Sequence, residues 1–240
     1  MIELKDFSLG FKGKDLIRNV STSFENASLT AIIGRNGSGK STLLKAICGL
    51  NPFYQGKILI NNLNLKDFSS SKLARSVSFV NTQRPRIANM KVIDVVGLGR
   101  SPYTGWSGKL GECDRKIIFD AIDKVGMSEY AIRSIDSLSD GECQKIMIAR
   151  AIAQDTDIIL LDEPTSFLDL PTRYELVTLL KELAENQHKT IVFSTHELDI
   201  ALKISHYIAL LNAGSLLNIP SDQMKDSHIL PKIFPSLQIF

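Results

Sequence analysis

The sequence predicts an α/β protein in which helices cover both faces of a parallel sheet. Short runs of consecutive apolar residues recur along the chain, as is typical of strands buried on both faces. Apolar residues at helical spacing separate these runs, and strands that alternate with helices form parallel sheets. A longer helical stretch, over residues 84–154, interrupts the alternation. We therefore expect a second, helical subdomain beside the sheet.

The positions of the expected elements follow from these patterns. Strands are predicted at residues 29–33, 57–61, 76–80, 157–161 and 190–194. Helices are predicted around residues 43–47, 117–125, 146–153 and 176–183. The first of these helices is expected to end at Asn51 and Pro52, because proline does not continue a helix. Residues 206–217 are typical of a hairpin that turns at residues 212–214.

Composition limits the class of protein. The chain has 240 residues, of which 44% are hydrophobic and 22% charged, as in an ordinary globular protein with one sizeable domain. The net charge is only +2, and the sequence has no block of residues with like charge. Both observations argue against nucleic acid as a partner. We expect neither a signal peptide nor a membrane span. The three widely spaced cysteines (Cys48, Cys113 and Cys143) are expected to be reduced thiols.

A glycine-rich loop after the first predicted strand predicts phosphate binding. It matches G-x-x-x-x-G-K-[ST] in full and consists of Gly34, Arg35, Asn36, Gly37, Ser38, Gly39, Lys40, Ser41 and Thr42. Its glycines let backbone N–H groups approach a phosphate, and the helix that follows presents its positive end. The Lys40 ammonium suits the β- and γ-phosphates of ATP, and the Ser41 hydroxyl suits Mg²⁺. The alternative is a glycine-rich turn without a function.

Two carboxylates follow the apolar strand predicted at residues 157–161. Asp162 and Glu163 directly follow the carboxyl end of this strand. Parallel sheets bind ligands at this edge, which also carries the phosphate loop. Asp162 is therefore a candidate ligand of Mg²⁺. Glu163 is a candidate general base for an attacking water molecule. The alternative is a pair of solvated acids at a strand end.

A further motif narrows the family. The segment Leu138-Ser139-Asp140-Gly141-Glu142 resembles the LSGGQ signature of ABC ATPases. Other segments are similar to the remaining motifs of that family: Gln83 to the Q-loop glutamine, residues 166–169 to the D-loop, residues 194–196 to the switch-histidine loop, and Phe11 to the aromatic residue that stacks on adenine. The resemblance covers nearly the whole chain, with the motifs in the family's order.

The resemblance implies a fold and a domain organisation. The expected fold is that of a P-loop NTPase, with a RecA-like core, an N-terminal antiparallel β part and a helical signature subdomain. Residues 1–240 would form a single ATPase domain. Within it, residues 1–83 and 156–240 would form the core, and residues 84–155 the helical subdomain.

The resemblance also implies roles for site residues. Two subunits, expected to be identical, would enclose two ATP molecules, each held by the phosphate loop of one chain and by Ser139 and Gly141 of the other. His196 would contact the γ-phosphate and act in catalysis with Glu163 and Gln83. Gln83 would also join Ser41 and Asp162 as a ligand of Mg²⁺. Phe11 and Asp169, the latter in the D-loop, would contact the nucleotide.

The signature departs from the family's usual residues at two positions. Asp140 replaces a glycine and Glu142 replaces a glutamine, and either carboxylate would repel a phosphate that it faced. Ser139 and Glu142 also have the spacing of an S-x-x-E capping box at the start of a helix. We therefore expect both acids to turn away from the nucleotide, or the closed dimer to be weakened.

The segment after Gln83 indicates the kind of transporter. Residues 90–105 are similar to a stretch in importer ATPases for iron–siderophore, haem and cobalamin uptake. This implies partnership with a membrane permease and, through it, a substrate-binding protein. The protein would then lie in the cytoplasm, on the inner face of the cell membrane. The alternatives are a soluble ABC-class ATPase of another process and the ATPase subunit of an ABC exporter.

Overall fold

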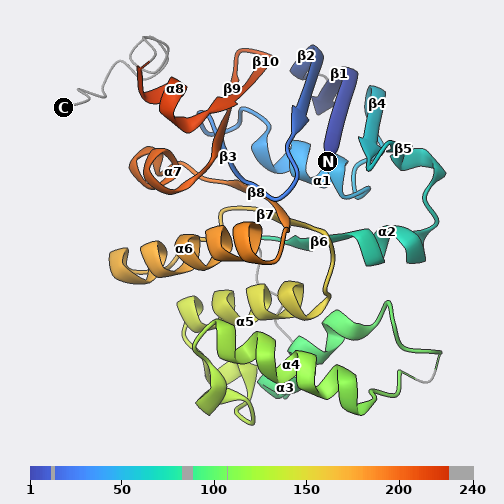
Figure 1. Ribbon diagram of the computed structural model, residues 1–240, viewed down its shortest axis with the longest axis vertical. Helices are drawn as coiled ribbons and strands as arrows, with labels where there is room; N and C mark the ends of the chain where they lie inside the picture. Colours follow the sequence, from blue (N-terminus) through green and yellow to red (C-terminus); the bar gives the residue numbers. More distant parts are fainter. Residues whose placement is uncertain (12–13, 83–88, 107, 227–240) are drawn as a thin grey trace.

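The computed structural model describes residues 1–11, 14–82, 89–106 and 108–226, and these residues form two sheets (Figure 1). The larger sheet has the strand order β10-β9-β3-β8-β7-β6, with parallel pairing from β9 to β6. Its strands are β3 (Leu29–Ile33), β6 (Val77–Val80), β7 (Ile158–Leu161), β8 (Thr190–Ser194), β9 (Tyr207–Asn212) and β10 (Ser215–Pro220). Strand β10 pairs antiparallel with β9 and completes the predicted hairpin.

The second sheet is antiparallel and comes from the N-terminal part of the chain. Its strand order is β2-β1-β4-β5. The strands are β1 (Ile2–Phe11), β2 (Lys14–Phe24), β4 (Tyr54–Ile60) and β5 (Leu63–Asn64). The N-terminal antiparallel β part expected from the family resemblance is therefore confirmed.

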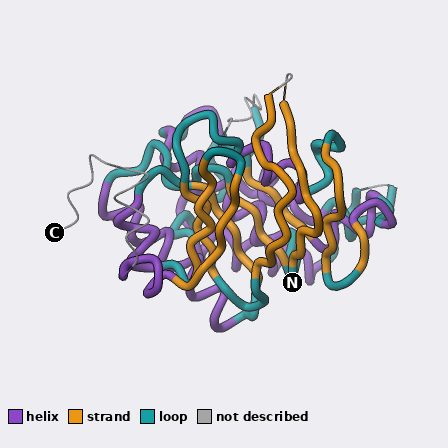
Figure 2. The backbone as a smooth tube through the Cα atoms, turned by 90° about the horizontal axis from the view of Figure 1, so that it is seen from above, coloured by secondary structure: helices purple, strands orange, loops and turns teal. Residues whose placement is uncertain are grey.

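The helices lie on both faces of the parallel sheet, as the continuous apolar strands predict. They are α1 (Lys40–Ile47), α2 (Ser70–Ser76), α3 (Val92–Gly97), α4 (Glu112–Lys124), α5 (Asp140–Ala153), α6 (Leu170–Asn186), α7 (Leu198–Ile204) and α8 (Ser221–Asp226). Seen from above, the strands run through the middle of the molecule with helices around them (Figure 2). Helices α3, α4 and α5 contact one another and fall between β6 and β7 in the sequence.

Strand β3 separates two hydrophobic cores. Its residues Ala31 and Ile33 pack with side chains of the helices α3 to α8, and Ile32 packs with α1 and the antiparallel sheet. Consecutive residues thus serve opposite faces, which is why all five residues of the strand, Thr30 included, are buried. Full burial of an isoleucine side chain stabilises the fold by about 1.5–3 kcal/mol. These contacts fix the strand whose carboxyl end leads into the phosphate loop.

A buried arginine ties the segment after α3 to the helical layer. Arg100 donates from Nε to Asp114 Oδ1 at 2.9 Å and from Nη1 to Ala153 O at 2.9 Å. Its guanidinium lies over the ring of Tyr103, 4.1 Å from the ring centroid. The Tyr103 hydroxyl donates to Asp155 O at 3.2 Å. Because a buried charge requires partners, this set of contacts holds residues 100–103 against α4 and α5.

Most expected elements are present, and several of their ends differ from the prediction, as for β4, which begins at Tyr54 and not at residue 57. The strands at residues 29–33 and 190–194 have the predicted ends. Helix α1 ends at Ile47 and not at Asn51, because Gly49 adopts a φ of +77°, which ends a helix with a left-handed residue. The domain limits at residues 84 and 155 stay a prediction.

No helix within the described ranges is both long enough and apolar enough to cross a membrane. The longest, α6, has 17 residues and carries charged side chains along its length. The three cysteines are free thiols, as expected. Burial raises the pKa of the Cys48 thiol to about 11, so this thiol stays protonated at neutral pH.

Gly99 is expected to be intolerant of a side chain, because a Cβ at this position would lie 2.3 Å from Arg150 O. Substitution Gly99→Ala should lower the free energy of unfolding by about 2 kcal/mol, measured by urea denaturation. Gly105→Ala is the matched control, since a Cβ there meets nothing within 4 Å. Equal stability of the two variants would contradict the packing described for Gly99.

Candidate active site

The phosphate loop connects β3 to α1 and buries its lysine. Ser38 N donates to Arg35 O at 3.1 Å, which forms the turn of the loop. Gly39 has a φ of +111° and lies against Leu16, where a side chain would be both strained and crowded. Lys40 Nζ donates to Gly34 O at 2.9 Å. Burial lowers the pKa of Lys40, and the nearby carboxylates of Glu163 and Asp162 oppose that shift.

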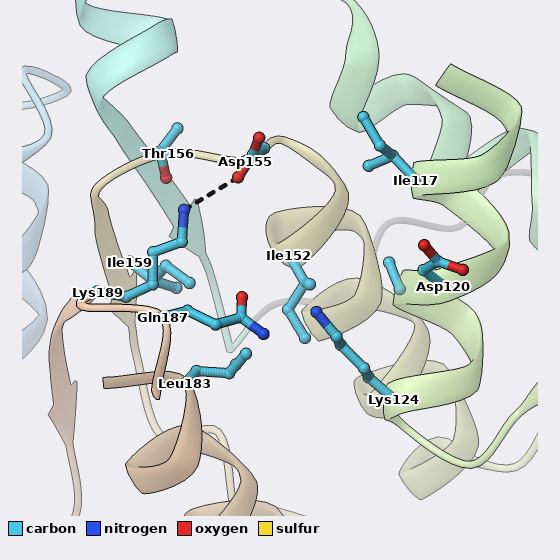
Figure 3. A pocket seen from close by; sticks show the side chains of 11 residues that line it. Ile117, Asp120, Lys124, Ile152, Asp155, Thr156, Ile159, Leu183, Gln187 and Lys189 are labelled. Atoms are coloured by element: carbon cyan, nitrogen blue, oxygen red, sulfur yellow. Dashed lines mark hydrogen bonds and ion pairs between the residues drawn. The ribbon is translucent and has the colours of Figure 1, made fainter. Parts of the chain in front are cut away.

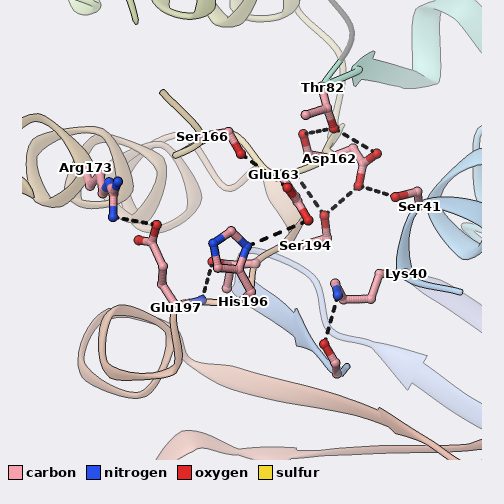
Figure 4. Close-up of polar contacts among 12 residues, drawn as sticks. Lys40, Ser41, Thr82, Asp162, Glu163, Ser166, Arg173, Ser194, His196 and Glu197 are labelled. Atoms are coloured by element: carbon pink, nitrogen blue, oxygen red, sulfur yellow. Dashed lines mark hydrogen bonds and ion pairs between the residues drawn. The ribbon is translucent and has the colours of Figure 1, made fainter. Parts of the chain in front are cut away.

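Asp162 is a buried carboxylate that binds hydroxyl groups from three other segments (Figure 4). Its Oδ1 accepts from Ser41 Oγ at 2.8 Å and from Ser194 Oγ at 2.7 Å. Its Oδ2 accepts from Thr82 Oγ1 at 3.1 Å. These residues lie at the start of α1 and after or at the ends of β6, β7 and β8. The carboxyl edge of the parallel sheet therefore brings together a carboxylate and several hydroxyls, oxygen donors of the kind that Mg²⁺ prefers.

Glu163 adopts a left-handed backbone conformation beside this cluster. Its φ is +48°, a conformation that costs a residue with a side chain about 1–3 kcal/mol and persists only where neighbours impose it. Ser194 Oγ accepts from Glu163 N at 2.9 Å, and Ser166 Oγ donates to Glu163 Oε2 at 3.3 Å. His196 Nδ1 lies 3.8 Å from Glu163 Oε1 (Figure 4). Since the carboxylate is partly exposed, it can reach a water molecule and accept its proton.

The signature segment forms the predicted capping box at the start of α5. Glu142 N donates to Ser139 Oγ at 3.3 Å, and Ser139 N donates to Glu142 Oε2 at 2.7 Å. Hydrogen bonds from Ser139, and then from the Tyr130 hydroxyl, hold the pKa of Glu142 below its usual value. The Glu142 carboxylate therefore caps the helix to which it belongs, α5. Asp140 is the exposed first residue of α5, and its expected orientation away from a nucleotide stays a prediction.

The remaining predicted residues are spread over several segments. Arg35, Asn36 and Gly37 are exposed in the phosphate loop, and Thr42 lies in α1. Asp169 caps α6 and accepts from Thr172 N at 3.2 Å. A Cβ on Gly141 would lie 3.0 Å from Leu168 Cδ2, so the signature packs against the D-loop of its own chain. Phe11 ends β1, but its side chain and all of Gln83 lie outside the described residues.

Thr82 and Ser194 are site residues to which the sequence assigned no role. Both hydroxyls bind Asp162, although Thr82 precedes it by 80 positions and Ser194 follows it by 32. The sequence signal for both is their place at the carboxyl ends of predicted strands, where ligand-binding residues gather, and Ser194 also begins the segment that resembles the switch-histidine loop. Position alone does not distinguish a hydroxyl that binds a carboxylate from one that faces solvent.

A separate cavity of about 140 Å³ lies between α4, α5 and the segment from α6 to β8 (Figure 3). Ile152, Ile159 and Leu183 form its apolar wall. Lys189 Nζ pairs with Asp155 Oδ1 at 3.0 Å across its rim. Pockets for drug-sized ligands have volumes of roughly 300–1,000 Å³. The cavity is too small for a nucleotide, and its lining includes no residue of the phosphate loop or of the Asp162 cluster.

Comparison with known proteins identifies close relatives. Residues 17–166 match the family model described as ABC transporter. The petrobactin import ATP-binding protein YclP of Bacillus subtilis is 34% identical, over 98% of this chain and 92% of its own. The iron(3+)-hydroxamate import ATP-binding protein FhuC of the same organism is 32% identical, over 90% of this chain and 80% of its own.

Solved structures have the same fold. An inward-facing structure of a metal-chelate type ABC transporter matches with a TM-score of 0.85 and 30% identity, over 98% of this chain and 88% of that one. A dimeric bacterial ABC transporter cassette, MJ0796, matches with a TM-score of 0.81 and 29% identity, over 92% of this chain and 99% of that one. The expected P-loop NTPase cassette fold and the resemblance stated from the motifs are confirmed.

Lys40 is expected to carry much of the nucleotide affinity. Substitution Lys40→Ala removes a buried ammonium from the phosphate loop and should weaken binding of a fluorescent ATP analogue about 10- to 100-fold. Lys45→Ala, in the last turn of the same helix, is the control and should bind normally. Similar affinities for both variants would show that Lys40 does not bind the phosphates.

Proposed function

Because the chain belongs to the ABC transporter family of ATP-binding subunits, we propose that it powers an importer of metal chelates of the iron–siderophore, haem or cobalamin type. ATP hydrolysis coupled to transport is the activity of this family. The observation that carries the ATP-hydrolysing part of the proposal is the joint placement of Lys40, Ser41, Asp162 and Glu163 at one edge of the parallel sheet. The names of two relatives, FhuC and YclP, describe them as import proteins, which supports import as the direction of transport.

Each residue at this edge has a role in the proposed reaction. Lys40 binds the β- and γ-phosphates and offsets their charge. Glu163 accepts a proton from the water molecule that attacks the γ-phosphate. His196, whose ring lies beside the Glu163 carboxylate, orients the γ-phosphate. Ser194 holds Asp162 and Glu163 in place, because its hydroxyl donates to the Asp162 carboxylate and accepts from the backbone N–H of Glu163.

Ser41 and Asp162 are the residues that would hold Mg²⁺, with Gln83 as a third candidate. The hydroxyl of Ser41 and the carboxylate of Asp162 already lie 2.8 Å apart, and both are hard oxygen donors. When bound, Mg²⁺ neutralises charge on the β- and γ-phosphate oxygens. Thr82 holds the second Asp162 oxygen and so orients the carboxylate toward Ser41.

The proposed working form is a homodimer in which each signature completes the partner's nucleotide site. The dimeric cassette among the structural relatives supports this arrangement. The start of α5 suits a phosphate, because the first backbone N–H groups of a helix lack partners within it. The Glu142 carboxylate accepts a hydrogen bond from Ser139 N within the capping box. This contact reduces the repulsion between the carboxylate and the partner's ATP.

An exposed apolar surface supports docking on a permease and, through it, use of a substrate-binding protein. Leu98 and Tyr103 are partly exposed in residues 90–105, the segment that resembles importer ATPases, and Trp106, which directly follows that segment, is fully exposed. Arg75 Nε donates to Pro102 O at 2.9 Å and anchors this segment to α2. Apolar side chains that are exposed close together in the chain are candidates for such a docking surface. The protein would then function on the inner face of the cell membrane.

Glu163→Gln should separate binding from hydrolysis. The amide keeps the shape of the side chain but cannot accept a proton, so phosphate release should fall about 10²- to 10⁴-fold while ATP affinity stays the same. Glu175→Gln, at an exposed position of α6, should hydrolyse ATP at the normal rate. Near-normal turnover in Glu163→Gln would remove Glu163 from the base role.

Affinity capture from native membranes in mild detergent tests the transport proposal. The tagged protein should recover a permease with many membrane spans, identified by mass spectrometry, because the proposed importer includes such a permease. Trp106→Ala should recover less of it and retain ATP binding. Recovery of ribosomal, DNA-bound or Fe–S assembly proteins without a permease would refute the importer, and recovery of an exporter permease would refute the direction of transport.

A further inference from the structure

Arg173 connects the two loops that follow β7 and β8. It lies in the first part of α6, and its Nε donates to Leu168 O at 2.7 Å. Its Nη1 lies 2.8 Å from Glu197 Oε1 (Figure 4). Leu168 belongs to the D-loop, and Glu197 directly follows His196. A single planar guanidinium thus holds a backbone carbonyl of one loop and a carboxylate of the other, which its fixed fork of donors allows.

Glu197 depends on this arginine. The carboxylate is only 12% exposed, and its Oε2 is buried without a hydrogen-bond partner among the described residues. Loss of Arg173 would therefore leave a largely buried carboxylate unpaired, a situation that a structure avoids by moving the group toward water. Glu197 N donates to Thr195 Oγ1 at 3.0 Å, so displacement of Glu197 would also displace the turn that carries His196.

The D-loop end of the connection is under backbone strain. Glu163 and Phe167 have φ values of +48° and +70°, which residues with side chains rarely adopt. Leu168, between the strained Phe167 and the cap of α6, is buried and packs against Gly141 of the signature. Strained conformations persist only where the surroundings impose them. The bond from Arg173 to Leu168 O is one such restraint.

We propose that Arg173 is a positioning residue that couples the D-loop, and through it the signature segment, to the placement of His196 in the same chain. This inference rests on the proposed function, in which the signature of each chain completes its partner's site. The path runs from Gly141 through Leu168 and Arg173 to Glu197. Engagement of the signature by the partner's nucleotide would thereby influence the histidine that faces the chain's own nucleotide.

The effect of losing the Arg173–Glu197 ion pair distinguishes this proposal from a purely structural role of the pair. A bridge that only stabilises the fold would lower the melting temperature without a selective effect on turnover. A bridge that positions His196 acts on the hydrolytic step, so its loss should lower kcat and leave ATP affinity unchanged. Since Arg173 and Glu197 act along one path to His196, losing both should cost no more than the larger of the two single losses.

The experiment compares Arg173→Met, Glu197→Gln and the double variant with the wild type. We expect kcat to fall roughly ten-fold in each single variant and by the same factor in the double variant. Affinity for a fluorescent ATP analogue should change less than about two-fold. Arg173→Lys keeps the charge but not the fork of donors, and should give an intermediate kcat. Lys181→Met is the matched control, because its exposed pair with Glu185 lies on the same helix away from both loops.

Several outcomes would overturn the inference. Unchanged kcat in Glu197→Gln, which preserves side-chain shape and is the variant least prone to misfold, would refute it. So would losses that multiply in the double variant, or a loss of ATP affinity in place of a loss of kcat. A wild-type protein that binds ATP without hydrolysing it would refute the proposed function itself, which separates the two failures.

Discussion

The hydrogen bonds to the buried Asp162 carboxylate are the constraint on which the site depends. A carboxylate taken out of water needs several donors, and Asp162 obtains them from Ser41, Thr82 and Ser194. Those donors belong to the start of α1 and to the ends of β6 and β8, the two strands that flank β7. One side chain therefore sets the distance between the phosphate loop and the strand ends. The parallel sheet supplies the common edge, and the two cores on its faces keep that edge rigid.

The same constraint explains the unusual backbone that follows. Glu163 N donates to Ser194 Oγ, which itself donates to Asp162, so the strained turn and the buried carboxylate share one hydroxyl. Arg173 then fixes the far end of the turn through Leu168 O. Local strain is thus imposed by contacts from β8 and α6, and it places Glu163 beside His196 at the surface of the site.

The sequence predicted whatever depends on local pattern. The strands at residues 29–33 and 190–194, the phosphate loop and the capping box of Ser139 and Glu142 each follow from residues close together in the chain. Contacts between distant segments were not predictable. The sequence near Thr82, Ser194 and Arg173 does not indicate their partners, because a hydroxyl or a guanidinium also occurs on solvated surfaces. The end of α1 was misplaced because the conformation of Gly49, and not the later proline, ended the helix.

The strand order has a consequence for synthesis on the ribosome. Strand β3 lies between β8 and β9, so Leu29 pairs with Ile191 and Thr30 with Tyr207. The phosphate loop is therefore translated early, but the sheet that supports it cannot close until the last strands emerge. Loop-closure entropy makes such distant pairings slow to form. The nascent apolar β3 stays without its partner strands for most of translation, which exposes this chain to aggregation until β8 and β9 are made.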